Sequence, residues 1–156
     1  MLQWAARPAN SGYRTMALLF LTTYVFLLRL PSEALPMVTA DASTHGPRHS
    51  VVEVSDDKVV LRLRRRKNRP AGSLLERTCW CKESKLTCPV HALGPLIRAK
   101  PPGSALFSGI SGAEANKALK HMLQQIGVTM AGEHRTHDIR RGHALDLQLS
   151  GEVLVL

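Results

Sequence analysis

The chain has 156 residues, and its 21 Lys and Arg outnumber its 12 Asp and Glu, so that the formal net charge is +9. This excess favours a polyanionic partner, and 44% hydrophobic residues supply one modest core, which excludes two full domains. Three Cys and the lack of a cleavable signal pattern exclude a secreted disulfide framework. We expect an intracellular, nuclear protein with no membrane partner.

The first strong pattern is an apolar segment at residues 16–30, which follows a loose tail at residues 1–14. A helix over these 15 residues would be about 22 Å long, short of the roughly 30 Å hydrocarbon core of a bilayer. We therefore predict a helix that is buried in the protein core. Because Pro31 cannot continue the helix, it should end near Arg29.

Alternating hydrophobic and polar residues then predict three short strands, at residues 51–55, 58–67 and 73–80, in a small antiparallel sheet. Side chains alternate along a strand, so the middle strand should have an apolar face and a basic face. Lys67 falls beyond the apolar row, at the tip of the hairpin. The apolar face comprises Val59, Leu61 and Leu63, and the other face comprises Val60, Arg62, Arg64 and Arg66.

Three helices are expected after the sheet, at residues 89–99, 113–126 and 136–151. Pro89 suits the first position of a helix, and Thr136 is a candidate N-terminal cap for the last one. The middle helix has apolar residues at spacings of three and four, which is typical of an amphipathic helix. The predicted fold class is therefore α+β, mostly helical, with a small three-stranded antiparallel sheet.

The densest run of positive charge covers residues 58–69, with seven Lys or Arg and no acid. Such a run is either a solvated strand face or a surface that binds a nucleic-acid backbone. In the second case, binding would weaken steeply with salt, because each neutralised phosphate releases counterions. The candidate DNA contacts are Arg62, Arg64, Arg65, Arg66 and Arg69, together with Arg141 from the last helix.

Four residues within a short stretch could bind a metal ion: Cys79, Cys81, Cys88 and His91. Their sulfur and nitrogen atoms suit a tetrahedral structural zinc, although the first pair has one intervening residue where two to four are usual. The alternative is that the cysteines are simply packed in the core.

A third group lies in the last predicted helix, where His137, Arg140 and Arg141 share one face. Guanidinium groups match phosphate oxygens, and an imidazole can exchange a proton near neutral pH. The apolar helix ending in Arg29 before PSEAL, the basic hairpin with Lys67, and the helix that opens with HDIRRGHA occur in this order. Together they resemble the catalytic domain of the tyrosine recombinases, the phage-integrase family.

The segments LLRLPSEALP, CPVHAL and RTHDIRRGHALDLQLSG are more narrowly similar to the recombinases of Crypton-type eukaryotic mobile elements. The resemblance implies that Arg29 and Arg140 clamp a DNA phosphate and that His137 is an acid/base and phosphate ligand. It implies that Lys67 protonates the leaving 5′ oxygen. The chemistry then requires no cofactor, because guanidinium groups stabilise the charge of the phosphorane. Glu33 departs from the commoner bacterial pattern by standing one residue further from Arg29.

The family's nucleophilic Tyr follows the HxxR motif, whereas the tyrosines of this chain, Tyr13 and Tyr24, both precede Arg29. We therefore expect residues 15–156 to form a partial, C-terminally incomplete catalytic domain, related to DNA recombination and integration. It should bind double-stranded DNA without cleaving it, and self-association on DNA stays open.

Two alternatives remain at this point. One is a zinc-stabilised nucleic-acid-binding module without recombinase chemistry, and the other is a small basic membrane-associated protein that uses residues 16–30. Only the recombinase hypothesis requires Arg29, Lys67, His137 and Arg140 to converge on one phosphate.

Overall fold

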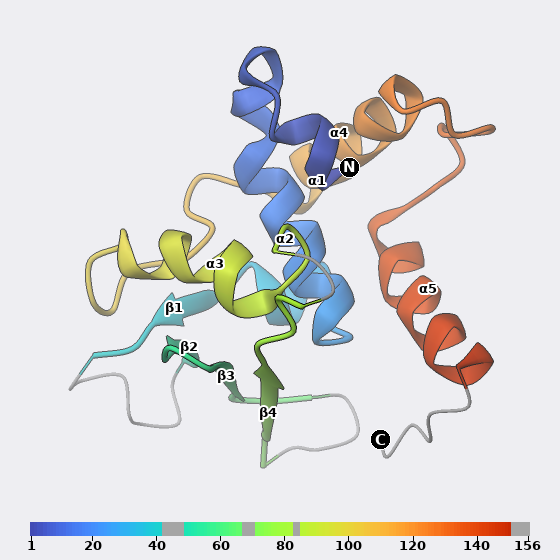
Figure 1. The fold of residues 1–156 in the computed structure, drawn as a ribbon. Coiled ribbons are helices and arrows are strands. Elements are labelled where there is room, and N and C mark those ends of the chain that lie inside the picture. Colours follow the sequence, from blue (N-terminus) through green and yellow to red (C-terminus); the bar gives the residue numbers. More distant parts are fainter. Residues whose placement is uncertain (42–48, 67–70, 83–84, 151–156) are drawn as a thin grey trace.

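A computed structural model describes residues 1–41, 49–66, 71–82 and 85–150. Within these ranges, five α-helices and one four-stranded sheet form an α+β fold (Figure 1). The sheet lies at one end of the molecule, lower in Figure 1, and the helices pack above and beside it. The predicted fold class is confirmed, but the sheet has one strand more than expected.

Helix α2 (Arg14–Val25) forms the centre of the core because it is apolar on all sides, and eight of its 12 residues are buried. The hydroxyls of Thr22 and Thr23 donate to the carbonyls of Leu18 and Leu19 at 2.8 and 2.9 Å, which satisfies them inside the core. The prediction of a buried helix is confirmed. In the part of the chain that the structure describes, no helix is both long and apolar enough to cross a bilayer.

The end of α2 differs from the prediction, because the helix stops at Val25 and not near Arg29. Leu27 adopts a left-handed backbone conformation with φ of 54°. The N–H of Leu28 then donates to the carbonyl of Thr23 at 2.9 Å, which is the closing bond of a Schellman motif. Because no glycine marks this stop in the sequence, the predicted end of the helix was too late. The early turn leaves Arg29 in an extended conformation.

The first residues of the chain pack on the helices, although residues 1–14 were expected to form a loose tail. They contain helix α1 (Leu2–Ala5) and a 3₁₀ helix, η1 (Pro8–Tyr13). The ring of Tyr13 stacks on His121, with 5.2 Å between ring centroids. This aromatic contact fastens the N-terminal segment to helix α4 (Gly112–Gln125), which contains His121.

Three strands follow the predicted antiparallel order, namely β2 (Ser50–Val54), β3 (Lys58–Leu63) and β4 (Ser73–Thr78). The apolar face of β3 is buried as predicted, with Val59, Leu61 and Leu63 at most 3% exposed. The strand ends at Leu63, four residues before the predicted end, and Lys67 and Arg69 lie outside the described residues.

The unexpected strand is β1 (Met37–Thr39), which pairs with β2 in parallel. Its other edge is bound by a distant loop, because the N–H of Thr39 donates to the carbonyl of Ser104 and the N–H of Leu106 donates to the carbonyl of Met37, both at 2.9 Å. A strand of three residues carries too little alternation to be recognised in the sequence.

Helix α3 (Pro89–Arg98) and helix α4 (Gly112–Gln125) match the predicted ranges within a residue. Helix α4 begins with a capping box, in which Ser111 and Glu114 bond each other's backbone N–H groups. Helix α5 (Thr136–Leu149) is also present. Its N-terminal cap is Arg135, whose N–H donates to the Asp138 carboxylate at 2.8 Å, so the assignment of the cap to Thr136 was wrong by one residue.

Candidate functional site

Arg29 is positioned by the short π-helical segment η2 (Leu30–Ala34), for which it is the N-terminal cap. The backbone N–H of Arg29 donates to the Glu33 carboxylate at 2.7 Å, and Glu33 is only 4% exposed. The same carboxylate pairs with Arg66, whose Nε lies 3.7 Å from Glu33 Oε1. Arg66 also donates to the carbonyl of Leu27 at 3.2 Å, so it holds the turn that leads into Arg29.

Helix α5 brings Arg140 to this region because its neighbouring turns are fixed on the end of α2. The buried ring of His143 stacks on Tyr24, with 4.4 Å between centroids, and His143 Nδ1 contacts the backbone carbonyl of Tyr24. One turn further on, Asp146 accepts a hydrogen bond from the Tyr24 hydroxyl. Residues three apart share a helix face, so the face that carries Arg140 turns toward α2.

The electrostatics of Arg140 show which charges surround it. Partial burial lowers the pKa of its guanidinium, the Glu33 carboxylate raises it, and the positive charges of Arg29 and Arg66 lower it again. An arginine stays charged at neutral pH in any case. The guanidinium of Arg140 is therefore within electrostatic range of two positive charges, Arg29 and Arg66, and of one negative charge, Glu33, so positive charge is in excess around it.

We call Arg29, Arg66 and Arg140 the arginine cluster. Two of its members, Arg29 and Arg140, were predicted from the sequence as a pair, and they are close enough for the charge of Arg29 to lower the pKa of Arg140. Arg66 was expected on an exposed strand face but is half-buried against Glu33, because β3 ends before it. His137 is exposed in the first turn of α5, and Lys67 lies outside the described residues.

Glu33 is the residue of this site that sequence reasoning missed as a functional neighbour. The signal was an acid four residues after Arg29, close to an arginine-rich hairpin. Tyr24, whose hydroxyl donates a hydrogen bond to Asp146, fastens α2 to α5. Partial burial, the hydrogen bond to Asp146 and the charge of Asp146 together raise the pKa of Tyr24 to about 12.

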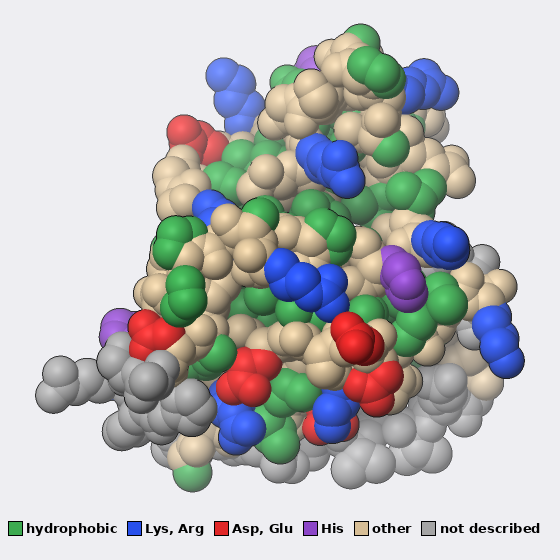
Figure 2. Space-filling model, turned by 60° about the vertical axis from the view of Figure 1, so that its left-hand side comes forward, with side chains coloured by type: hydrophobic (Ala, Val, Ile, Leu, Met, Phe, Trp, Pro, Cys, Tyr) green, Lys and Arg blue, Asp and Glu red, His purple; other side chains and the backbone are tan. Residues whose placement is uncertain are grey.

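The exposed face of the sheet is less basic than residues 58–69 suggested. Arg62 pairs with Glu53 at 3.5 Å and Lys58 pairs with Glu76 at 3.2 Å, across neighbouring strands. Figure 2 shows basic and acidic side chains close together on the lower part of the molecule, where the sheet lies. The acidic side chains of β2 and β4 thus offset the positive charge of Lys58 and Arg62 on β3.

The remaining predicted DNA contacts differ in their surroundings. Arg64 and Arg65 follow the end of β3 and are exposed. Arg141 is also exposed, at 73% of its side chain, and its Nη1 lies 3.5 Å from an oxygen of Asp138. The positive charge of the hairpin is therefore concentrated after β3, next to the arginine cluster in the sequence.

Three of the four predicted metal ligands form one group, and the fourth, Cys88, lies next to two of them. One atom from each of Cys79, Cys81 and His91 lies within 4.8 Å of the other two, and this group could hold a metal ion. Cys88 Sγ lies 3.6 Å from Cys79 Sγ and 3.4 Å from His91 Nδ1. The cluster joins the end of β4 to the start of α3.

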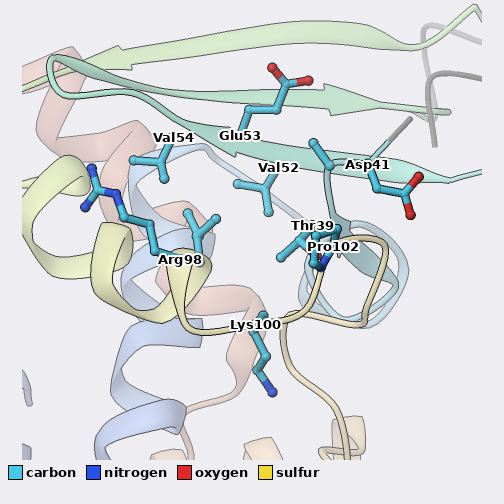
Figure 3. A pocket seen from close by; sticks show the side chains of 10 residues that line it. Thr39, Asp41, Val52, Glu53, Val54, Arg98, Lys100 and Pro102 are labelled. Atoms are coloured by element: carbon cyan, nitrogen blue, oxygen red, sulfur yellow. The ribbon is translucent and has the colours of Figure 1, made fainter. Parts of the chain in front are cut away.

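A hollow of about 640 Å³ lies elsewhere, between β1, β2 and the end of α3 (Figure 3). Its charged side chains Asp41, Glu53 and Lys100 point in different directions, as Figure 3 shows, so they do not converge on a common ligand. The hollow is distinct from both the arginine cluster and the metal-ligand cluster.

No protein-family model, no curated protein and no solved structure matches this chain.

Proposed function

We propose that the chain binds duplex DNA in the manner of a tyrosine-recombinase catalytic domain, with one backbone phosphate held between Arg29 and Arg140. The observation that carries the proposal is that Arg29 and Arg66 both contact the buried Glu33 carboxylate, the first through its backbone N–H and the second as an ion pair. Arg140, which lies far from them in the sequence, is close enough for the charges of all three to shift its pKa. Guanidinium groups fit phosphate oxygens as two-pronged donors, and like charges gathered in one place are stabilised by an anion between them.

A polymeric anion suits the surroundings better than a single phosphate. Arg64 and Arg65 are exposed directly before Arg66, so cations extend from the cluster along the chain. Each phosphate contact releases counterions from DNA, which adds affinity without base readout. A structural zinc module alone would give no reason for a partly buried Arg140 beside Arg29.

The proposed activity is binding and not strand cleavage. In recombinase chemistry, a Tyr hydroxyl attacks the phosphate and forms a covalent intermediate. Tyr24 is unsuited to this role, because its hydroxyl is bonded to Asp146 and its pKa is raised to about 12 by burial and by that carboxylate. The Tyr13 ring is stacked on His121. We expect no covalent adduct when this chain meets a suicide DNA substrate.

The test measures the affinity for a fluorescent 30-base-pair duplex at several salt concentrations. The double variant R29A/R140A should lose about a hundredfold in affinity, as expected for charge-assisted hydrogen bonds of about 1.5–3 kcal/mol each that share one phosphate. The control R98A/K100A removes the same charge beside the hollow at the end of α3 and should lose less than about fivefold. Equal losses in the two double variants would refute the proposal.

We propose a second property, zinc binding, from the convergence of Cys79, Cys81 and His91. Thiolate and imidazole ligands together favour zinc over the oxygen-seeking cations. In the alternative hypothesis of a zinc-stabilised nucleic-acid-binding module, this metal is the main structural feature and no recombinase ancestry is needed. Metal analysis of purified, reduced protein should give one zinc per chain, and protein with no stoichiometric zinc would remove this hypothesis.

A further inference from the structure

We infer that Cys88 is the fourth ligand of a closed Cys₃His zinc site, which fastens strand β4 to helix α3 and has no open position for chemistry. This inference rests on the zinc binding proposed for Cys79, Cys81 and His91. It adds a buried residue to that group, because Cys88 has no exposed surface and is the N-terminal cap of α3.

The distances among Cys79, Cys88 and His91 fit one face of a tetrahedron. With Zn–S of about 2.3 Å and Zn–N of about 2.0 Å, tetrahedral ligands lie about 3.8 Å apart for two sulfurs and about 3.5 Å apart for sulfur and nitrogen. Cys88 Sγ lies 3.6 Å from Cys79 Sγ, and His91 Nδ1 lies 3.5 and 3.4 Å from the sulfurs of Cys79 and Cys88. Three of the edges therefore have the lengths that a shared zinc ion requires.

Cys88 lies at the N-terminus of helix α3, a position where the negative charge of a zinc–thiolate group would be stabilised. As the N-terminal cap of a 10-residue helix, Cys88 lies where the helix dipole is positive, and its side chain caps no backbone N–H. Three thiolates and one zinc ion carry a net negative charge, which the same dipole stabilises. A buried Cys with this placement is more than a small apolar residue of the core.

Four protein ligands would leave no site for water or substrate, which is the mark of a structural zinc. The N–H of Cys79 also donates to the carbonyl of Asp57 at 2.6 Å, so the zinc would tie the β2–β3 turn, β4 and α3 together. This is the Lys58 end of β3, whereas Arg64 to Arg66 follow the opposite end. Six residues of strand separate the two by about 17–20 Å, so the zinc should stabilise the fold without touching DNA.

The experiment compares zinc affinity and the cobalt-substituted spectrum of the reduced wild type, C88A and T87A. C88A removes one of three thiolate ligands, so it should lower the sulfur-to-cobalt charge-transfer intensity by about a third. Zinc affinity should fall by more than the roughly 10–100-fold that the loss of an outer-shell partner costs, while T87A, an exposed neighbour, should keep both. Unchanged affinity and spectrum in C88A would overturn the inference and leave the proposed zinc binding intact.

X-ray absorption of the zinc-loaded wild type keeps the test independent of whether C88A folds. Three sulfurs at about 2.3 Å and one nitrogen at about 2.0 Å would support the closed site, and two sulfurs with lighter ligands would overturn it. If the wild type binds no zinc at all, both the proposed zinc binding and this inference fail. Binding of the 30-base-pair duplex is expected to persist in folded C88A within about threefold, because the zinc ligands and Arg64 to Arg66 lie beyond opposite ends of β3.

Discussion

Arg140 and Arg141 are adjacent arginines on α5 with the same charge, and they are expected to differ sharply in DNA binding. Arg140 is partly buried beside Arg29, Arg66 and Glu33, whereas 73% of the Arg141 side chain is exposed, next to Asp138. The variants R140A and R141A therefore remove equal charge from neighbouring positions of one helix. Only the first removes a guanidinium from the arginine cluster.

The magnitude follows from the surroundings of each side chain. A charge-assisted contact to a phosphate in a partly buried site is worth about 1.5–3 kcal/mol, so R140A should weaken DNA binding about 10–100-fold. Arg141 is largely solvated and already paired with Asp138, so R141A should cost less than about 1 kcal/mol, or roughly fivefold at most.

Fluorescence anisotropy against a 30-base-pair duplex at 50–200 mM salt measures both effects. R140A should also reduce the slope of log affinity against log salt by about 0.9, the value for one lost phosphate contact. Circular dichroism melting serves as the control for folding, since R140A removes an attraction to Glu33 as well as repulsion from Arg29 and Arg66. Equal losses for R140A and R141A would refute the reasoning, because affinity would then follow net charge alone.

Three further predictions concern the supports of the site. E33Q should lower the free energy of unfolding by about 3 kcal/mol, because it leaves Arg66 without its buried counter-charge. The exposed control E53Q should lower it by less than about 1 kcal/mol. Urea unfolding measures both variants, and equal losses would count against a buried ion pair. Folding raises the pKa of Tyr24 to about 12, so the contribution of Tyr24 to the free energy of unfolding is complete below pH 10 and is lost as pH rises toward 12. Urea unfolding at pH 8 to 12 should show this decline in the wild type and not in Y24F. Identical pH profiles of the free energy of unfolding would contradict the prediction. S111A should cost about 1 kcal/mol in thermal unfolding by removing the capping box of α4, and a cost near zero would show that the cap adds nothing.

The parts of the fold that the sequence predicted are those with a strong local signal. The apolar row of β3, the amphipathic α4 and the all-apolar α2 each repeat their pattern over several residues, and their burial follows. The metal-ligand cluster was found because its four residues are close in the chain and share a chemistry.

The features that the sequence did not predict depend on contacts between distant segments. The end of α2 is set by Leu27, a residue with no intrinsic preference for a left-handed conformation, and the carbonyls there are held by Arg66 and Arg77 from the hairpin. Strand β1 exists because a loop near Ser104 covers its free edge. The place of Arg66 in the arginine cluster likewise depends on β3 ending at Leu63. The sequence pattern of alternating side chains continues past Leu63 and therefore predicted a longer strand.

The most direct test of the central claim is a double-mutant cycle on DNA affinity with R29A, R140A and R29A/R140A. If the two arginines hold one phosphate, the loss in the double variant should fall short of the sum of the single losses by more than about 1 kcal/mol. Losses that add to within about 0.5 kcal/mol would show that Arg29 and Arg140 act on separate phosphates or on none, and would contradict the account.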